Sequence, residues 1–517
     1  MKKLYFIFLT LALISLSSIS KAQLVYKDVA HIFHERCTTC HHEGQHAPSM
    51  MNYSQIFPLA WSIQNDLQIG KMPPWSPDTS YSRFVSEHII SQAEKDEIVS
   101  WVNAGALKGD TTLAPPAPLY AQYKLNGTPD LILKIPSFTS NAGSHDAYNC
   151  FSIPTGLTQG RIIRAYEIVP GNSLIVHHVL VGIDTNGTTP SDLSGTCYNT
   201  PGDIGIGGYA PGAPPTVFPG QAPLKAGIFL KAGSNIILQI HYPPGTVGQT
   251  DSTQVRIYFY PLNETGVRTV YNSVPLQNWQ LYIPANTTPT YTFQYPTNGT
   301  LPTTLSMFAT FPHSHKVCKS IVNYAYSGTD TIPLIRINKW DFNWQGYYTF
   351  PKLVKVPAGY KLFSSHLYDN TTNNPNNPHS PPALVIAGTG TNDEMLFDAF
   401  LFLAYQPGDE NIDVASILAN DPLLNPLGVN EIAAPAANQA YVFPSPASDK
   451  LNIYLTKKGE YKIGLLNITG QTVLQVASSF TDNTTLDVKN IPAGLYILEI
   501  TDTKKNERIT KKIMIAK

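Results

Sequence analysis

The stretch Ile236-Ile-Leu-Gln-Ile-His241, followed by Val255-Arg-Ile-Tyr-Phe259, decides the fold. Short apolar runs of this kind, separated by Pro-Gly, Asn-Gly and Pro-Pro turns, are typical of antiparallel strands. The pattern runs from Asp130 to about Tyr405, which is too long for a single β-sandwich. We therefore expect two β-sandwich domains, at 113–280 and 281–410.

The regions on either side of this stretch have a different character. Residues 23–112 are expected to be helical, with Ser91 and Glu94 in the capping-box positions of the last helix. A link rich in Asn, Pro and Ala at 411–440 precedes a final strand-rich module at 441–517. The predicted fold class is a multidomain, mainly β protein with one small all-α domain.

The composition limits the possible functions. A chain of 517 residues is long enough for several domains. Its formal net charge of -1 gives no global positive field that would attract nucleic acid or anionic lipid. We therefore expect no nucleic-acid partner.

The first 22 residues have the pattern of an export signal. Lys2 and Lys3 precede an apolar run, and Ser20-Lys-Ala22 places small residues at the cleavage positions. An uncleaved anchor helix is the alternative, but the apolar run is short. No later apolar stretch is long enough to span a membrane, so no transmembrane segment is expected after signal removal.

The motif Cys37-Thr-Thr-Cys40-His41 is the attachment signature of a c-type haem. Two thiols would bond the haem vinyl groups, and the histidine would bind the iron. A zinc half-site or a redox dithiol is the alternative, although a second Cys or His pair and a βαβ context are both missing. The sequence therefore predicts covalent haem c on residues 23–112.

The second axial ligand of this haem is expected to be a thioether, which raises the potential. Met72, in Lys71-Met-Pro-Pro-Trp75, is the best candidate, because prolines can hold the loop rigidly. Met50 and Met51 are rivals. The segment resembles the small cytochrome c domains of exported bacterial oxidoreductases, both in its MPPW loop and in its closing WVNAGALKGD at 101–110.

Three groups of histidines and one methionine suggest a metal centre. His313 and His315 would lie on the same face of a strand, where both imidazoles can reach one ion. Adjacent His177 and His178 would point to opposite faces, so their joint use requires a strand end or a bulge. A thioether ligand disfavours zinc and stabilises Cu(I). The third histidine group is His241, and the methionine is Met395.

These landmarks resemble those of the copper type II, ascorbate-dependent monooxygenases, the family of the peptidylglycine and dopamine hydroxylases. The resemblance covers about residues 128–405 and includes, in order, the motifs DAYNCF at 146, HHV at 177, QIHY at 239, HSH at 313 and DEM at 393. It implies two antiparallel jelly-roll-like copper domains.

The resemblance also implies roles for individual residues. His177, His178 and His241 would hold an electron-storing copper, while the copper that binds oxygen and does catalysis would be held by His313, His315 and Met395. Cys150 and Cys197, the candidate disulfide among the other three cysteines, match a family disulfide pair and leave Cys318 as a free thiol.

The implied reaction is hydroxylation of a substrate C–H bond by O2. The fused haem would supply or relay electrons, with ascorbate or another external reductant as a further source. Two positions depart from the peptide hydroxylases: Phe311 replaces an arginine that anchors a substrate carboxylate, and Ala399 replaces a tyrosine. A small molecule less polar than a glycine-extended peptide is therefore allowed. Four aromatic residues are either its pocket or sandwich core: Trp340, Trp344, Tyr347 and Tyr348.

The C-terminal module resembles the sorting domain of type IX secretion in Bacteroidota. The resemblance rests on FPSP at 443–446, LLNITGQ at 465–471, IPAGLYI at 491–497 and a lysine-rich end. It implies an immunoglobulin-like β-sandwich, contact with the secretion machinery, and a secreted or cell-surface location. An ordinary immunoglobulin-like accessory module is the alternative.

Two other functions remain open at this stage. A non-catalytic surface protein that transfers electrons or binds copper would keep the same ligands. A glycan-processing sandwich would instead show paired carboxylates and no copper.

Overall fold

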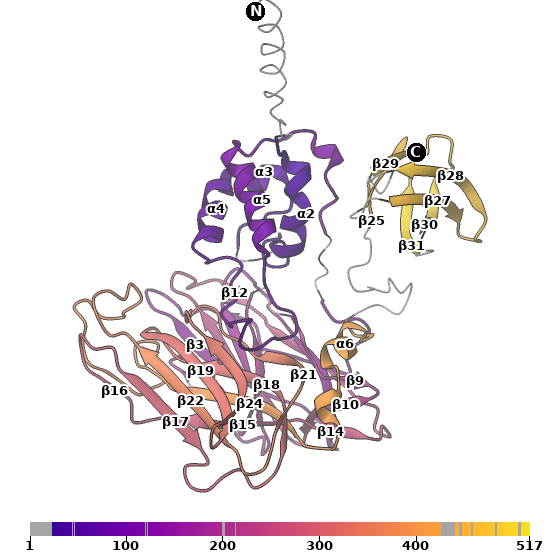
Figure 1. Cartoon of the computed structure of the whole chain (residues 1–517). Coiled ribbons are helices and arrows are strands. Elements are labelled where there is room, and N and C mark those ends of the chain that lie inside the picture. The colour runs from indigo at the N-terminus through magenta and orange to yellow at the C-terminus, as the bar shows by residue number, and fades with distance from the viewer. Residues whose placement is uncertain are drawn as a thin grey trace, which may run out of the picture.

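The computed structural model describes residues 23–43, 45, 47–118, 120, 123–198, 202–211, 214–424, 440–443, 447–455, 459–480, 483–504 and 508–516. The expected export signal, 1–22, and residues 425–439 of the expected linker lie outside the described residues. The protein is mainly β with few helices (Figure 1). Within the described ranges, every helix is too short or too polar to cross a membrane.

A bundle of short helices forms the N-terminal region (Figure 1). The Ser91 hydroxyl accepts from the Glu94 amide at 3.2 Å, and the Ser91 amide donates to the Glu94 carboxylate at 2.7 Å, which is the expected capping box. Phe33 and Trp101 meet edge to face in the buried centre. The elements are α2 (Tyr26–Arg36), α3 (Tyr53–Ile56), η1 (Phe57–Leu59), α4 (Ala60–Gln68), α5 (Gln92–Asn103) and η2 (Thr111–Leu113).

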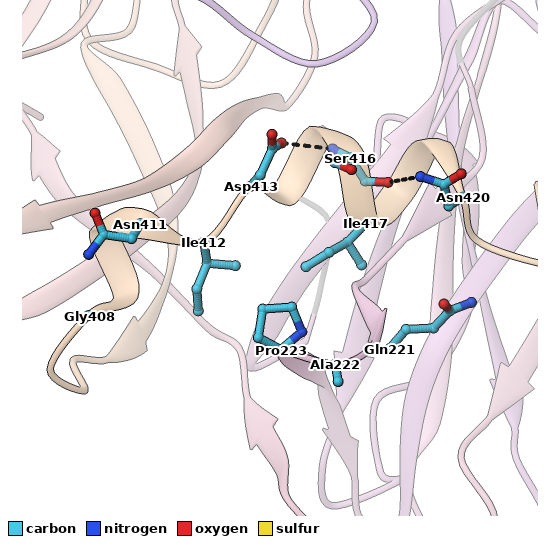
Figure 2. Close-up of a pocket in the computed structure, with 10 residues that line it drawn as sticks. All are labelled: Gln221, Ala222, Pro223, Gly408, Asn411, Ile412, Asp413, Ser416, Ile417 and Asn420. Atoms are coloured by element: carbon cyan, nitrogen blue, oxygen red, sulfur yellow. Dashed lines mark hydrogen bonds between the residues drawn. The ribbon is translucent and has the colours of Figure 1, made fainter. Parts of the chain in front are cut away.

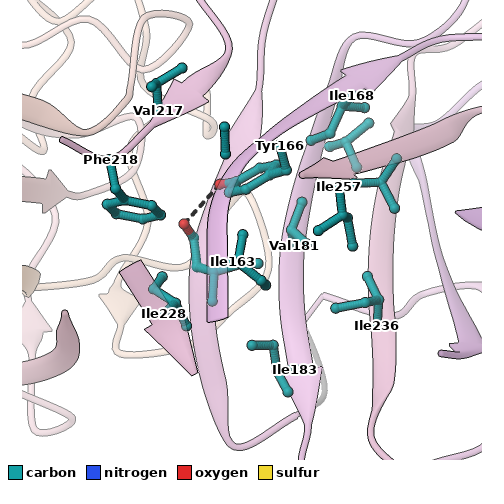
Figure 3. Close-up of a cluster of buried hydrophobic side chains, with 14 of the residues drawn as sticks. Ile163, Tyr166, Ile168, Val181, Ile183, Val217, Phe218, Ile228, Ile236 and Ile257 are labelled. Atoms are coloured by element: carbon teal, nitrogen blue, oxygen red, sulfur yellow. Dashed lines mark hydrogen bonds between the residues drawn. The ribbon is translucent and has the colours of Figure 1, made fainter. Parts of the chain in front are cut away.

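The first β module contains two sheets that share one hydrophobic core. Figure 3 shows Ile163 and Tyr166 of one sheet packed beside Val181 and Ile183 of the other. The seven-stranded sheet contains β1 (Leu131–Lys134), β13 (Gln254–Phe259), β4 (Arg161–Val169), β10 (Leu224–Leu230), β14 (Val267–Thr269), β8 (Thr216–Val217) and β9 (Gly220–Gln221). The five-stranded sheet has the order β6 (Asp192–Gly195), β3 (Ala147–Pro154), β11 (Asn235–Tyr242), β5 (His178–Asp184) and β7 (Ile204–Tyr209). A small pair is formed by β2 (Phe138–Thr139) and β12 (Thr250–Asp251).

The second β module also shares one main core among its sheets. Its first strand begins at Tyr271, before the boundary expected near residue 280. One sheet has the order β15 (Tyr271–Gln277), β24 (Phe397–Ala404), β18 (Leu305–His313) and β21 (Tyr348–Val356). Another has the order β17 (Thr290–Tyr295), β22 (Lys361–Tyr368), β19 (Cys318–Ser327) and β20 (Asp330–Ile337). A short pair consists of β16 (Tyr282–Ile283) and β23 (Val385–Ile386).

The segment between α4 and α5 docks on the second β module. The Asp78 amide donates to the Arg336 carbonyl, and the Val85 amide donates to the Thr349 carbonyl, each at 2.8 Å. Phe84 is buried in the core of that module. The helical region is therefore attached to the β structure by hydrogen bonds and apolar packing as well as by the covalent chain.

Two short helical elements, η3 (Asp409–Asn411) and α6 (Val414–Ala419), lie in or beside the stretch expected as a linker. The apolar side of α6 belongs to the core of the first β module, and Arg164 of β4 bonds the buried Asp421 carboxylate at 2.8 Å. A pocket of about 590 Å³ lies between α6 and the Gln221–Pro223 turn (Figure 2).

The C-terminal module has its own hydrophobic core. One sheet contains β25 (Ala440–Phe443), β26 (Lys450–Leu455) and β29 (Asn483–Asp487). The other has the order β28 (Thr472–Phe480), β27 (Gly459–Asn467), β30 (Gly494–Asp502) and β31 (Arg508–Ile515).

Candidate metal centre

Three histidines of the first β module converge at the ends of two neighbouring strands. His178 is the first residue of β5 and pairs in register with His241 of β11. His177 lies just before β5, and its amide donates to the His241 carbonyl at 3.0 Å. Because the chain leaves the strand at this point, the side chains of adjacent His177 and His178 can face the same metal centre. Their joint use was expected to require such a strand end or a bulge.

The geometry of these three imidazoles suits one metal ion. Their Nδ1 atoms lie 3.2 to 3.3 Å from one another. Three nitrogens at about 2.0 Å from one ion, with tetrahedral angles between them, would be about 3.3 Å apart. The spacing thus matches a set of metal ligands in which each histidine uses Nδ1.

Asp146 fixes the tautomer of His241 in this cluster, a role that the sequence did not reveal. The Nε2 of His241 bonds the Asp146 carboxylate at 2.7 Å, which leaves Nδ1 with its lone pair free. That hydrogen bond lowers the pKa of Asp146, so the carboxylate is charged at neutral pH. Tyr148 stacks on the His241 ring at 4.5 Å between centroids. Asp146 and Tyr148 both belong to the DAYNCF motif at 146–151, so this motif was the sequence signal that could have pointed to their roles.

The second histidine pair lies in the other β module. His313 ends β18, and its ring lies 5.2 Å from that of His315, nearly perpendicular to it. The Nδ1 of His313 bonds Gln345 at 2.5 Å, and the Nδ1 of His315 bonds the Asp393 carbonyl at 3.0 Å. With Nδ1 acting as the donor to these oxygens, each Nε2 keeps a lone pair that can bind a metal.

Burial keeps this second pair uncharged. It lowers the pKa of His313 to about 4 and the pKa of His315 to about 3. Both rings are therefore neutral at physiological pH, which is the form that ligates metal.

A buried carboxylate, Glu394, joins the segments that carry His315 and Met395. It accepts hydrogen bonds from the amides of His315, Met395 and Val317 and from the Ser314 hydroxyl. The Met395 carbonyl in turn accepts from Ser314 at 2.7 Å. The structure thus brings the Met395 backbone beside the residue between the two histidines, and its side chain is buried.

A hydrogen bond between two hydroxyls links the β modules near the histidine groups. The Tyr148 hydroxyl and Thr391 hydroxyl are 3.2 Å apart, which links β3 to the loop that carries Met395. Burial lowers the pKa of His178 well below its ordinary value, and nearby His241, His177 and His313 lower it further.

The Cys37–His41 motif forms a compact turn after α2. The Cys37 carbonyl accepts from the amides of Cys40 and His41. The Nδ1 of His41 bonds the Pro48 carbonyl at 2.9 Å, which leaves Nε2 available to an iron ion. Burial raises the pKa of both thiols, that of Cys37 to about 12, whereas a redox dithiol requires a lowered pKa.

The methionines near this motif occupy different environments. Met50 is buried in the core of the helical region. Met51 and Met72 are half-buried, and the Met72 amide bonds the Asp66 carbonyl at the end of α4. Met72, the favoured candidate, therefore keeps part of its surface outside the helical core, whereas Met50 does not.

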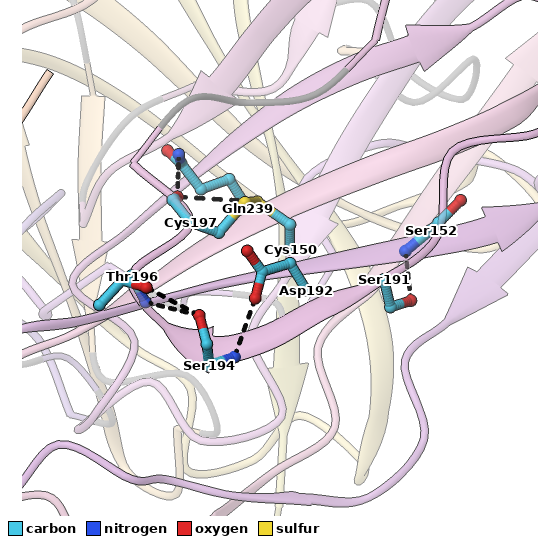
Figure 4. Close-up of a disulfide and its surroundings, with 8 residues drawn as sticks. All are labelled: Cys150, Ser152, Ser191, Asp192, Ser194, Thr196, Cys197 and Gln239. Carbon is cyan, nitrogen blue, oxygen red and sulfur yellow. Dashed lines mark hydrogen bonds between the residues drawn. A yellow bond between two sulfur atoms is a disulfide. The ribbon is translucent and has the colours of Figure 1, made fainter.

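Cys150 and Cys197 form a disulfide, as expected (Figure 4). Cys318 is a free, buried thiol. The disulfide joins β3 to the segment after β6. Gln239 of β11 donates to the Cys197 carbonyl at 2.7 Å. The disulfide thus supports the strands that carry Tyr148 and His241.

The four aromatic residues proposed as either pocket or core divide between the two environments. Trp340 and Tyr348 are buried in the core of the second β module. Trp344 and Tyr347 are only half-buried. The pocket in Figure 2 is lined by none of the candidate ligands.

Comparisons with known proteins define the C-terminal module. Residues 441–516 match the family described as secretion system C-terminal sorting domain. A search of curated proteins finds no match.

Solved structures show only weak likeness. PorZ, a surface component of the type IX secretion system of Porphyromonas gingivalis, is 15% identical with a TM-score of 0.14, and the match covers 26% of this chain and 15% of PorZ. β-Glucuronidase 3 of Bacteroides uniformis is 9% identical with a TM-score of 0.13, over 44% of this chain and 27% of the enzyme. A biofilm-associated protein BSP domain is 9% identical with a TM-score of 0.14, over 78% and 84% of the two chains.

The sorting domain is the segment that directs a protein to the type IX secretion route. The chain ends in a type IX secretion sorting domain, and the protein is exported to the cell surface or secreted.

Proposed function

We propose that the protein is an exported copper monooxygenase, which hydroxylates a C–H bond of a small organic substrate with O2. The observation that carries the proposal is the triangle of Nδ1 atoms of His177, His178 and His241, with Asp146 setting the tautomer of His241. In this proposal the β modules are two jelly-roll-like copper domains, and the C-terminal module is an immunoglobulin-like sandwich.

Each residue set has a distinct task. His177, His178 and His241 offer three nitrogens to one ion, and His313, His315 and Met395 offer two nitrogens and a thioether to another. Bound copper would supply one-electron chemistry and the activation of O2. Gln345 and the Asp393 carbonyl orient the second pair, while burial keeps both rings neutral.

The helical region would be a cytochrome c domain that supplies or relays electrons. Cys37 and Cys40 offer thiols for covalent haem attachment, and His41 offers Nε2 to the iron, because its Nδ1 is held by Pro48. Met72 is the proposed sixth ligand. An attached donor raises the effective concentration of reductant at the β modules. The overall reaction inserts one oxygen atom into the C–H bond and releases the other as water, with two electrons and two protons consumed.

The proposal is tested on the full chain produced with cytochrome c maturation and loaded with copper. We expect two Cu(II) per chain by metal analysis and electron paramagnetic resonance, and O2 consumption by the reduced protein. His241→Ala should remove one copper signal, and His313→Ala the other. His145→Ala, a change of an exposed histidine outside both groups, should remove neither.

Two other results would contradict the proposed function. Copper uptake without O2 consumption across a panel of substrates would indicate a non-catalytic electron-transfer or copper-binding protein. A chain that binds no copper would contradict both readings.

A further inference from the structure

Half-buried aromatic rings surround the second histidine pair, and we call them the aromatic cluster. The Phe311 ring lies nearly parallel to the His313 ring at 5.9 Å and stacks on Tyr347 at 4.8 Å. Phe397, the register partner of His313, meets it edge-on at 6.0 Å. Phe342 meets His315 edge-on at 5.9 Å.

The cluster differs from the core beside it. Phe400, three residues after Phe397 on β24, is fully buried, whereas all four rings of the cluster keep part of their surface exposed. Phe311 lies two residues before His313, so both side chains project from the same face of β18. Partly exposed apolar rings thus lie next to both histidines.

Two charged groups near the cluster, Lys316 and Asp398, have partners of their own. Lys316 bonds Asn392 at 3.3 Å, and Asp398 is buried with Ser364 and His366. None of the cation–π pairs found in the described part of the chain involves a ring of the cluster. In the metal-free chain, a carboxylate placed against these rings would lose its hydration without gaining a partner. An ammonium group would also lose its hydration there, and attraction to the ring faces, worth about 0.5 to 2 kcal/mol, would be its one compensation.

One uncharged polar pair lies at the edge of the cluster. The Asn272 amide donates to the Tyr347 hydroxyl at 3.1 Å, which leaves the hydroxyl hydrogen of Tyr347 free to donate. The Tyr347 hydroxyl is therefore the polar group at the edge of the cluster that can pair with a neutral hydroxyl on a ligand.

We infer that the site takes an uncharged aromatic molecule, with its ring against Phe311 and Phe397 and a neutral hydroxyl at Tyr347. The inference rests on the proposed function, since it is the metal on His313 and His315 that would make this cluster a substrate site. It names the substrate class for that reaction. Phe311 is the specificity-determining residue, because it occupies the position nearest to His313 along the strand face.

The test compares three probes of nearly equal size: 4-methylbenzyl alcohol, 4-methylbenzylamine and 4-methylbenzoate. Their dissociation constants are measured by ligand-observed NMR on the full chain, both metal-free and loaded with Cu(I) under argon. We expect the neutral alcohol to bind at least about tenfold more tightly than either charged probe, a difference of about 1.4 kcal/mol.

Matched variants assign the preference to the cluster. In the Phe311→Arg protein, 4-methylbenzoate should bind most tightly of the three probes. In the Phe311→Leu protein, the alcohol should still bind most tightly, but more weakly than it binds the wild type. Phe229→Arg, the same change at a half-exposed ring on β10, should leave the wild-type order unchanged. Preference of the wild-type protein for a charged probe would overturn the inference.

The two proposals fail in different ways. If both coppers load and none of the probes binds, the ligand class is wrong while the proposed function stands. If the metal-free chain prefers the alcohol but never takes up copper, the proposed function is wrong while the ligand preference stands.

Discussion

At the scale of the residue, the most informative side chain is Asp146. It holds Nε2 of His241 at 2.7 Å and so presents Nδ1 to the other two histidines. Outer partners of this kind commonly change metal affinity by about 10- to 100-fold when they are removed. The chemistry of the three-histidine cluster thus depends on a carboxylate that is not itself placed among the proposed ligands.

We therefore predict that Asp146→Asn weakens copper binding at His177, His178 and His241 by about 10- to 100-fold, because the charged acceptor of His241 is lost. Copper bound by His313 and His315 should keep its affinity. Competition with a chelator, followed by electron paramagnetic resonance, measures both sites.

The matched control is Asp192→Asn, a change of an exposed carboxylate on β6 that contacts none of these histidines. It should behave as wild type. A three-histidine site that binds copper as tightly in the Asp146→Asn protein as in the wild type would contradict the assigned role.

At the scale of the element, the segment between α4 and α5 connects the helical region to the second β module. Phe84 is 5% exposed and lies 5.4 Å from Tyr348 and 5.3 Å from Phe350. Trp75 meets Tyr348 edge-on at 5.5 Å. His88 approaches Trp344, and the next residue, Gln345, bonds His313. One short segment, 341–348, therefore touches the helical region on one side and the histidine pair on the other.

We predict that Phe84→Ala detaches this segment, since deleting a buried phenylalanine side chain typically costs about 3 to 5 kcal/mol. The variant should be cleaved between α4 and α5 by a protease that leaves the wild-type protein intact at the same concentration. Thermal unfolding should begin at a lower temperature.

Phe57→Ala provides the comparison for this variant, because Phe57 is 48% exposed in the helical region. It should change neither the cleavage pattern nor the unfolding. A Phe84→Ala protein as resistant to proteolysis as the wild type would show that the polar contacts of Asp78 and Val85 alone hold this segment in place.

At the scale of the whole molecule, the C-terminal module and the β modules have separate cores. The described residues of 440–516 pack around their own buried cluster, whereas α6 and Leu424 pack on the first β module. The bond between Arg164 and buried Asp421 closes the latter contact. The boundary that matters for stability therefore lies after residue 424 and not at residue 411.

We predict that a chain ending at residue 424 keeps the copper content and unfolding temperature of the remaining modules. A chain ending at residue 412 should be less stable, because it loses α6 and leaves Arg164 without Asp421; breaking a buried ion pair costs about 3 to 5 kcal/mol. Calorimetry of the two truncated chains makes the comparison. Equal unfolding temperatures would contradict this division of the molecule.

Sequence by itself determined the features that depend on local patterns. Alternation indicated a mainly β chain, the Ser91 and Glu94 spacing predicted a capping box that the structure contains, and the C-terminal motifs identified the sorting domain. The Cys150–Cys197 pair was indicated by motif resemblance and is bonded in the structure. Metal and haem binding stay predictions.

Only the tertiary structure decided which groups meet. Periodicity separates His177 from His178; the end of β5 and its register with β11 bring both to His241. The supporting roles of Asp146, Gln345 and Glu394 likewise come from segments far apart in the chain. The physical reason is that strand alternation is set by neighbours along the chain, whereas ligand geometry is set by register and by where each strand ends.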